Sequence, residues 1–478
     1  MTTYGFNIHH TYQDLPPIFY SLQKPLKFAN PSYIKFNALL ASELGLDKNA
    51  LDSSKGIQFL LGNTSQLNPN LTSMAYAGHQ YGQFNTLGDG RAHLLFEHKN
   101  QTALYDIQLK GSGPTVYSRG FDGRLTLRSA LLEYLMSEAL HALKIPTTRS
   151  LAVIKTGDFI KRMGKEDGAV LLRVSKSHLR VGTFEYAVNK KDNAALKALT
   201  DYAIKRHDSD LINTDDGYLK WFKRVIERQA KLIAKWQSVG FVHGVMNTDN
   251  MLISGETIDF GPCAFIDTYN LDTVFSSIDT LSRYAYGKQP FIGSWNLAVL
   301  GQMMIPLINE THSKPIDKIQ AALKQYGDIF EAHYYKILGN KIGIHTLKEN
   351  DIPFIDELLT LMETYHADYT NTWISLSEKQ FPNTDLYKSE AFLSWFKQWK
   401  SRIQQEKNPL ELMKKTNPQV IPRNHLVKNA LDKAAYHHDF KDYNALLHVL
   451  KNPFNTNVST YFQTPPTTDE KFITYCGT

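Results

Sequence analysis

The chain has 478 residues, of which 42% are hydrophobic and 12% aromatic, the composition of a folded globular protein with room for two or three domains. Its 53 basic and 47 acidic residues leave a net charge of only +6, without a basic stripe, so nucleic-acid binding is not expected. Only two cysteines occur, which excludes a disulfide framework and a cysteine-rich zinc site.

The opening stretch has no apolar core behind a basic start and no arginine, so we expect neither a signal peptide nor a transit peptide. The longest uncharged run, Phe291 to Ile308, is interrupted by polar residues and a proline. That pattern predicts a buried helix and no membrane span. The sequence therefore predicts a cytoplasmic monomer with no membrane or nucleic-acid partner.

Residues 1–65 have a mixed pattern, with a short helix expected around Ile34 to Leu44. The stretches His93 to Glu97 and Ala103 to Leu109 suit strands that end in turns. Arg124 to Leu143 carries an apolar stripe at helical spacing and predicts a helix.

Two further strands are expected near Leu151 to Lys155 and Ala169 to Val174. Leu219 to Ser238 carries one apolar face over many turns and predicts a long helix. Near the C-terminus, Leu426 to Ala435 and Tyr443 to Leu450 are typical of two short helices, and a polar tail follows them.

This order, strands with one helix followed by a long helix, indicates an α+β bilobal fold. A small β-rich N-lobe would cover a larger helical C-lobe, with the active site in the cleft. The predicted division is an N-terminal extension (1–65), the N-lobe (66–188), the C-lobe (189–400) and a C-terminal extension (401–478).

The most informative stretch runs from Val242 to Asn250 and is followed by Asp259-Phe260-Gly261. It resembles the metal centre of protein kinases, in which a base Asp two residues after the His precedes an Asn and then Asp-Phe-Gly. Asn250 and Asp259 occupy the metal positions, but Val245 stands where the base would be. A single Asp or Asn is ordinarily a turn or cap residue. The two together predict a site for Mg²⁺ and nucleotide phosphates, and the resemblance implies that the α+β bilobal fold is protein-kinase-like.

Lys110 ends a predicted strand, where a kinase-like fold has a lysine that contacts nucleotide phosphates. Glu133, on the next predicted helix, would pair with it. A lysine at a strand end is otherwise usually a solvated charge, and only the downstream metal motif favours the functional interpretation.

Gly88, Gly90 and Arg91 lie before Lys110, where a loop covering the nucleotide would fall. Glycines let backbone N–H groups approach phosphates, and the arginine adds a guanidinium fork. Many glycine pairs of this kind are plain hairpin turns. A second glycine-rich stretch, residues 111–124, follows the lysine and has no counterpart in a standard kinase.

Arg173 and Arg180 stand among apolar neighbours and suit phosphate oxygens. The alternative is a pair of salt bridges between the lobes. Asp249, next to Asn250, is a displaced carboxylate that would accept the proton of an attacking hydroxyl. Its alternative role is to stabilise the turn at residues 247–250.

These residues and several longer motifs resemble the selenoprotein O family, also called YdiU, over nearly the whole chain. The further motifs are Ala77-Gly78-His79-Gln80-Tyr81-Gly82, Gln108-Leu109-Lys110-Gly111-Ser112-Gly113, Arg283-Tyr284-Ala285-Tyr286, Gln289-Pro290, Trp295-Asn296-Leu297 and Ile421-Pro422-Arg423-Asn424-His425. Ser282 and Lys288 depart from the family pattern outside the nucleotide centre.

The resemblance implies a pseudokinase-fold enzyme that transfers AMP from ATP to protein hydroxyls, with the nucleotide flipped relative to kinases. Bacterial members are also described as using UTP with Mn²⁺, so the implied cofactor is Mg²⁺ or Mn²⁺ and the partners are protein substrates, with self-modification included. Asp249 would be the proton acceptor, and the metal ligands would be Asn250 and Asp259. The implied nucleotide-binding residues are Gly88, Gly90, Arg91, Lys110, Asp122, Gly123, Arg173, Arg180 and Asp259.

Cys476 occupies the place of the selenocysteine in the family's eukaryotic members, and we interpret it as a candidate redox residue. Free terminal cysteines are often incidental. For the whole chain, three hypotheses remain open from the residues themselves: a protein nucleotidyltransferase, a phosphotransferase with a displaced base, and a non-catalytic pseudokinase that binds nucleotide.

Overall fold

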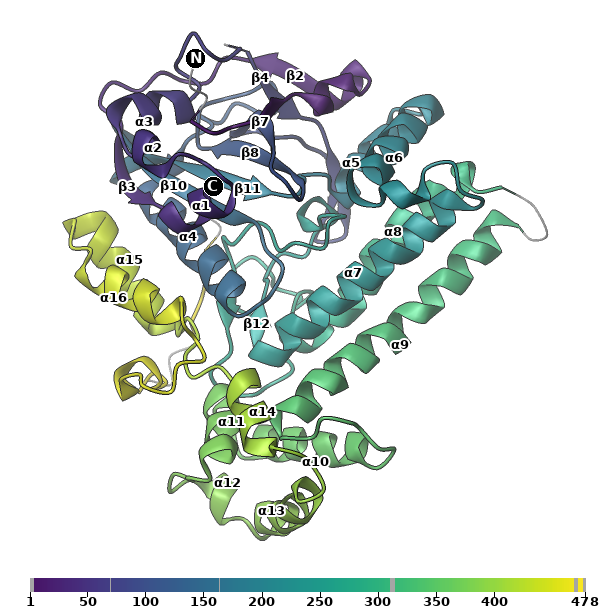
Figure 1. The fold of residues 1–478 in the computed structure, drawn as a ribbon, viewed down its shortest axis with the longest axis vertical. Helices are drawn as coiled ribbons and strands as arrows, with labels where there is room; N and C mark the ends of the chain where they lie inside the picture. Colours follow the sequence, from purple (N-terminus) through teal and green to yellow (C-terminus); the bar gives the residue numbers. More distant parts are fainter. Residues whose placement is uncertain (1–3, 69, 163, 310–313, 468–471, 476–478) are drawn as a thin grey trace.

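The computed structural model describes residues 4–68, 70–162, 164–309, 314–467 and 472–475. A sheet-rich part lies at the top of Figure 1, and long helices run diagonally away from it. Strands are gathered in the N-terminal region and helices in the C-terminal region, so the α+β class is confirmed. Among the described helices, none combines the length and the apolar character needed to cross a membrane.

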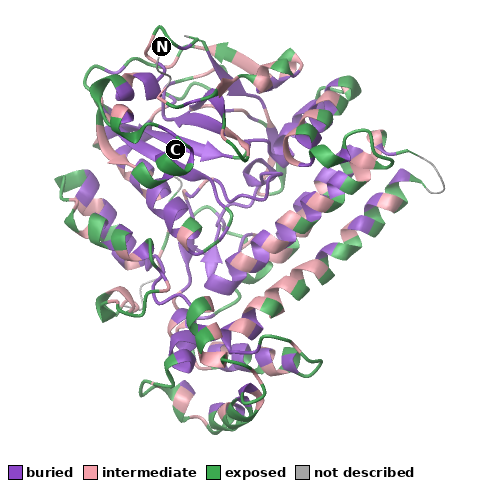
Figure 2. Ribbon diagram, viewed as in Figure 1, coloured by how far each residue is buried: buried purple, intermediate pink, exposed green. Residues whose placement is uncertain are grey.

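The sheet-rich part is built on one nine-stranded sheet in which neighbouring strands are antiparallel. All four predicted strands are confirmed, and three of them, residues 92–99, 149–161 and 165–175, are longer than predicted. The central strands are largely buried on both faces (Figure 2), and in β8 the buried face includes polar side chains that alternate with apolar ones. The path of the sheet is β2 (Tyr20–Gln23), β4 (Leu71–Met74), β7 (Ala92–Lys99), β8 (Leu104–Lys110), β11 (Lys165–Ser175), β10 (Arg149–Lys161) and β3 (Ser32–Phe36), with β1 (Ile8–His9) beside β7 and β9 (Leu125–Thr126) beside β11.

The helix predicted around residues 34–44 is wrong in its first half. Ile34 to Phe36 belong to β3, which pairs with β10, and the helix α1 (Ala38–Glu43) begins only after Asn37. The Asn37 side chain accepts a hydrogen bond from the N–H of Leu40 and caps that helix. Pairing with a distant strand outweighs the local pattern here. Two further helices, α2 (Lys48–Leu51) and α3 (Ser54–Leu60), complete the segment before residue 65.

The helix predicted at residues 124–143 is confirmed as α4 (Leu127–Ala142), although it begins later because residues 125–126 form β9. Thr126 caps it by accepting the N–H of Ser129 at 3.1 Å. Most of α4 is buried against the sheet and the C-terminal helices, so its apolar residues occupy more than one face.

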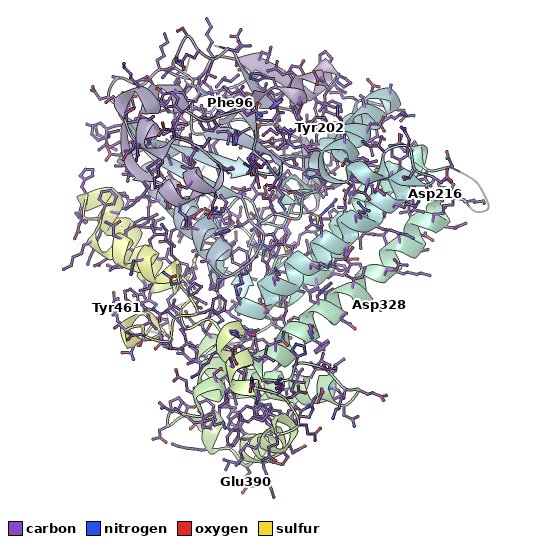
Figure 3. All side chains as sticks on the ribbon, in the orientation of Figure 1. Phe96, Tyr202, Asp216, Asp328, Glu390 and Tyr461 are labelled. Carbon is purple, nitrogen blue, oxygen red and sulfur yellow. The ribbon has the colours of Figure 1, made fainter. Side chains whose placement is uncertain are left out.

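The helical part confirms the long helix predicted at residues 219–238 and a helix in the run predicted from Phe291 to Ile308, although that helix ends at Met304 and Phe291 itself is exposed. Gly240 ends the first of these with φ of 74°, a left-handed conformation that favours glycine. The labelled residues in Figure 3 show the extent of the helical part: Tyr202 lies beside the sheet, and Glu390 lies at the opposite end of the molecule. The helices are α5 (Val181–Asn189), α6 (Asn193–His207), α7 (Gly217–Val239), α8 (Gln289–Met304), α9 (Pro315–Lys341), α10 (Asp351–Thr364), α11 (Tyr369–Glu378), α12 (Asp385–Lys388), α13 (Glu390–Ile403) and α14 (Pro409–Thr416).

Both helices predicted near the C-terminus are confirmed, as α15 (Asn424–His437) and α16 (Lys441–Leu450). They pack on α4, where the hydroxyl of Tyr443 donates to the carbonyl of Leu131 at 2.9 Å. Further on, the described tail segment 472–475 lies beside Ser276 and Ser277. Cys476 lies outside the described residues.

Candidate active site

The loop between residues 243 and 250 is held by a short strand pair, β12 (Phe241–Val242) and β13 (Ala264–Phe265). This pairing brings the segment after Val242 beside the segment that contains Asp259. His243 lies between the two, with its Nε2 2.8 Å from the carbonyl oxygen of Ile258. Within this loop, residues 248–250 form one 3₁₀ turn, which fixes the backbone conformation of Asp249 and Asn250.

Lys110, Glu133 and Asp259 meet in the structure, although they come from β8, α4 and the segment after the 243–250 loop. The Lys110 ammonium donates to Glu133 and lies 3.3 Å from Oδ1 of Asp259. Arg173 pairs with the other carboxylate oxygen of Glu133 at 3.0 Å. Lys110, Glu133 and Arg173 are buried, so Lys110 is not the solvated charge that a strand-end lysine usually is.

The charges around Asp259 determine its ionisation. Burial alone would raise the pKa of its carboxyl group, but Lys110, Arg91 and Arg173 outweigh that effect and hold the pKa well below its usual range. The carboxyl group therefore remains ionised. Because the side chain is 33% exposed, it is also open to a ligand on one side.

Asp249 has the opposite environment. Burial raises the pKa of its carboxyl group from 3.8 to about 7, since Arg180 lowers the pKa by less and Asp259 raises it further. Its Oδ2 accepts a 3.4 Å hydrogen bond from Gln80, and its Oδ1 is buried with no partner among the described residues. A buried carboxylate oxygen without a donor suits a group that receives a proton.

Asn250 donates its side-chain amide to the carbonyl of Val245 at 3.0 Å, which commits the amide nitrogen and leaves the oxygen for a cation. Val245 thus takes part in the site through its backbone. Within the described part of the chain, no three or more His, Cys, Asp or Glu residues are grouped as a metal site. An amide oxygen and one or two carboxylates, completed by phosphate oxygens, still fit the way in which Mg²⁺ is commonly bound.

The loop with Gly88 and Gly90 packs against the second glycine-rich stretch. A Cβ on Gly88 would lie 2.4 Å from the ring of Tyr117, and φ of 151° adds strain for any other residue. The hydroxyl of Ser118 donates to the carbonyl of Gly90, and the carbonyl of Arg91 accepts the N–H of Gly111. The two stretches therefore form one wall beside Lys110.

Asp122 and Gly123 lie at the outer end of that wall. Asp122 is exposed and makes two hydrogen bonds with Arg162, at 2.8 and 2.9 Å, which lower the pKa of its carboxyl group. Gly123 has φ of 64°, and a Cβ there would lie 2.2 Å from the carbonyl oxygen of Gly113. Asp122 is thus separate from the buried cluster around Lys110.

Arg180 lies on the other side of the site, buried at the N-terminus of α5. Its guanidinium donates to the carbonyl of Asp249 at 2.6 Å, lies 3.7 Å from Asp89 and stacks over Tyr76 at 4.4 Å from the ring centre. Arg180 thus contacts groups from both the sheet-rich and the helical part, whereas the partners of Arg173, Gln108 and Glu133, both lie on the sheet side. The two roles considered for Arg180, a salt bridge between these parts and phosphate binding, are therefore compatible with each other.

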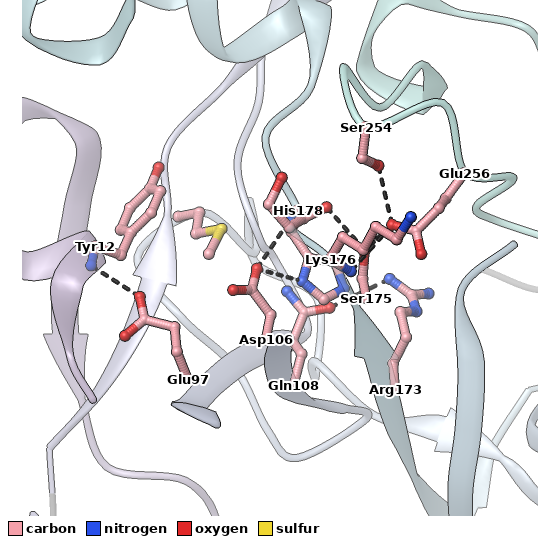
Figure 4. Close-up of polar contacts among 12 residues, drawn as sticks. Tyr12, Glu97, Asp106, Gln108, Arg173, Ser175, Lys176, His178, Ser254 and Glu256 are labelled. Carbon is pink, nitrogen blue, oxygen red and sulfur yellow. Dashed lines mark hydrogen bonds and ion pairs between the residues drawn. The ribbon is translucent and has the colours of Figure 1, made fainter. Parts of the chain in front are cut away.

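A buried polar network behind the site had not been predicted (Figure 4). Asp106 accepts from the backbone N–H of His178 at 2.7 Å, and Gln108 accepts from Arg173 at 3.2 Å. With Lys110, these residues alternate along β8 and so share one face of the strand. That alternation of polar residues in a buried strand was the signal in the sequence that could have revealed them.

A hairpin of β5 (Ala77–Gln80) and β6 (Gln83–Thr86) covers the 243–250 loop. The hairpin contacts are so close that a Cβ on Gly78 would lie 2.3 Å from Oδ1 of Asp249. A Cβ on Gly182 in α5 would lie 2.0 Å from the carbonyl oxygen of Ala77. Both positions therefore require glycine for steric reasons.

Comparison with known proteins gives consistent relatives. Residues 4–451 match the family described as protein adenylyltransferase SelO. The chain is similar to protein nucleotidyltransferase YdiU of Clostridium perfringens (strain SM101 / Type A), with 47% identity over 99% of this chain and 98% of that protein. Proteins of the same name from Bacillus cereus (strain G9842) and Lachnoclostridium phytofermentans are each 46% identical, with 99% of both chains covered.

Proposed function

This chain belongs to the SelO family and is a protein nucleotidyltransferase, and on that premise we propose that it transfers AMP from ATP, or UMP from UTP, to Ser, Thr or Tyr hydroxyls of proteins and releases pyrophosphate. We also propose that the α+β architecture is a kinase-like bilobal fold with the nucleotide flipped. The order of strands and helices and the Lys110–Glu133 pair support this proposal.

One observation carries the proposal. Asp249 has a buried carboxylate oxygen with no partner among the described residues and interacts electrostatically with the ionised Asp259, which itself pairs with Lys110, while Val245 fills the kinase base position. A site arranged in this way retains the groups that bind a charged nucleotide and has its proton acceptor at a new place. Such a displaced acceptor is compatible with attack on the α-phosphorus, which the family membership favours over the γ-phosphorus.

The roles of the residues follow from their charges. Asp249 accepts the proton of the attacking hydroxyl. Lys110, held by Glu133, and the guanidinium groups of Arg173 and Arg180 stabilise negative charge on the phosphates and on the leaving pyrophosphate. Gly88, Gly90 and Arg91 bind the phosphates from the sheet side, and the outer turn at Asp122 and Gly123 contributes to binding of the nucleotide.

We assign Mg²⁺ or Mn²⁺ to the oxygens of Asn250 and Asp259, on the donor set and on the free amide oxygen of Asn250. When bound, the cation neutralises phosphate charge and orients the triphosphate. Asp259 serves this role because its low pKa keeps it ionised.

The test is incubation of the protein and candidate acceptor proteins with ATP labelled on the α- or the γ-phosphate. The α-label is expected on protein, with release of pyrophosphate, and the chain itself is included as an acceptor. Asp259→Ala should abolish the labelling. Transfer of the γ-label would overturn the proposal in favour of a phosphotransferase, and full activity of Asp259→Ala would overturn the metal assignment.

A further inference from the structure

The β5–β6 hairpin is anchored to the 243–250 loop at two places. Near its turn, the N–H of Tyr81 donates to Oδ1 of Asn247 at 3.1 Å, and the hydroxyl of Tyr284 donates to the same oxygen at 2.6 Å. The second anchor lies nearer the proposed base, where His79 of β5 connects the hairpin to the loop. The second anchor involves a residue from a third element, α5, and has no explanation in the proposed nucleotide site.

This second anchor is a closed ring of hydrogen bonds between three side chains and one backbone group. The Thr248 hydroxyl accepts the backbone N–H of His79 at 2.7 Å and donates to Oε2 of Glu185. Oε1 of Glu185 pairs with Nδ1 of His79, which closes the ring. Thr248 and Glu185 are buried, with relative exposures of 0% and 4%.

The two residues that the ring fixes each precede a residue at the proposed base. Thr248 precedes Asp249, and His79 precedes Gln80, whose side-chain amide donates to Oδ2 of Asp249 at 3.4 Å. A shift of either partner in the ring would therefore move the carboxylate or its hydrogen-bond donor. The imidazole of His79 is also packed edgewise on Trp295, 5.3 Å between ring centres, which limits its rotation.

Burial of a carboxylate is costly, and apolar residues could join α5 to the loop at a lower cost. Among the described contacts of Glu185, the hydrogen-bond partners of its carboxylate are Thr248 and His79 alone. The carboxylate thus holds Thr248, on the loop of the proposed base, and His79, on the hairpin that covers this loop. Small displacements at such a place have large kinetic effects.

We propose that Glu185, Thr248 and His79 form a positioning clamp that fixes the Asp249 carboxylate for proton transfer. The clamp rests on the proposed function, since it acts through Asp249. In the described hydrogen bonds and ion pairs, none of its three side chains contacts Lys110, Glu133 or Asp259.

A matched pair of variants tests the clamp. Thr248→Val keeps the shape of the side chain but removes both hydrogen bonds of the hydroxyl, whereas Thr248→Ser keeps the hydroxyl. With α-labelled ATP and a fixed acceptor protein, we expect kcat of Thr248→Val to fall roughly 10- to 100-fold. The KM for ATP should stay within about twofold, because the phosphate-binding groups are unchanged, and Thr248→Ser should regain most of the lost rate.

A double-mutant cycle shows whether the clamp acts through the base. In an Asp249→Asn background, Thr248→Val should reduce the residual rate less than about threefold, because the group that it positions is already absent. Glu185→Gln, which keeps hydrogen-bonding atoms, should be less impaired than Glu185→Ala. Thermal melting of each variant and binding of a fluorescent ATP analogue control for loss of the fold.

The outcomes separate the two proposals. If the wild type transfers no α-label, the proposed function fails, whatever the variants do. If the wild type is active and Thr248→Val keeps its full kcat, the clamp alone is refuted. It is refuted equally if Thr248→Val loses ATP affinity and kcat together, or if its effect is fully additive with Asp249→Asn.

Discussion

Replacement of Gly78 by alanine tests the geometry of the proposed base directly. An added Cβ would lie 2.3 Å from Oδ1 of Asp249 and 2.8 Å from its Cβ and Cγ atoms. Ordinary contacts begin near 3.4 Å, so the carboxylate or the hairpin must move by about 1 Å. Gly78 has no positive φ, so the backbone itself would accept alanine and the effect is purely steric.

A misplacement of about 1 Å at a reacting group costs on the order of 100-fold in rate. We therefore expect kcat for transfer of the α-label to fall roughly 100-fold in Gly78→Ala, while binding of a fluorescent ATP analogue changes less than about twofold. The measurement is steady-state transfer to one acceptor protein over a range of ATP concentrations.

Gly327→Ala is the matched control, because nothing lies within 4 Å of a Cβ there and the residue is an exposed position of α9. It should leave transfer unchanged and stabilise the helix by about 0.5–1 kcal/mol. Wild-type kcat in Gly78→Ala would refute the close packing of the hairpin on Asp249 or the role of Asp249 itself.

Three further predictions concern charged side chains. Lys110→Met removes the cation between Glu133 and Asp259, and α-label transfer should fall at least about 100-fold; an active variant would contradict its role. Burial lowers the pKa of Lys341 from 10.5 to about 7, which costs roughly 5 kcal/mol of stability below pH 7, and the cost disappears as pH rises towards 10.5. At pH 7, Lys341→Met should therefore have a higher free energy of unfolding than the wild type in chemical denaturation. This difference should shrink by about 2 kcal/mol at pH 9, and a difference that does not change with pH would contradict this reasoning. Arg423→Ala leaves Asp267 and Asp368, each 2.6 Å from the guanidinium, without their cation, and we expect a loss of about 3–5 kcal/mol in chemical denaturation; unchanged stability would show that water replaces the pair.

Local signals in the sequence were sufficient for part of the fold and of the site. The long apolar face of α7 and the alternating or continuous apolar strands predicted their elements correctly, because packing follows periodicity directly. Lys110 at a strand end and Glu133 on the next helix form the ion pair that the resemblance to a kinase centre predicted, whereas their role in nucleotide binding stays a prediction.

The remainder depends on contacts between distant segments. Residues 34–36 became a strand because β10, more than 100 residues later, offers an edge for pairing. Glu185, His79 and Thr248 come from three elements, and no spacing rule connects them. Cysteine chemistry at residue 476 is a prediction from position alone.

The two carboxylates of the site explain how a loop without a kinase base remains suited to catalysis. Asp259 faces Lys110, Arg91 and Arg173, and its pKa is held low despite burial. Asp249 faces mainly Arg180, and its pKa rises to about 7. Environments that push the pKa values of neighbouring acids apart give them different tasks. The ionised acid is suited to a cation, and the acid that titrates near neutral pH is suited to accept and release a proton. Both acids lie on the connection between the paired strands β12 and β13, so a valine at position 245 still leaves the site with two acids in different environments.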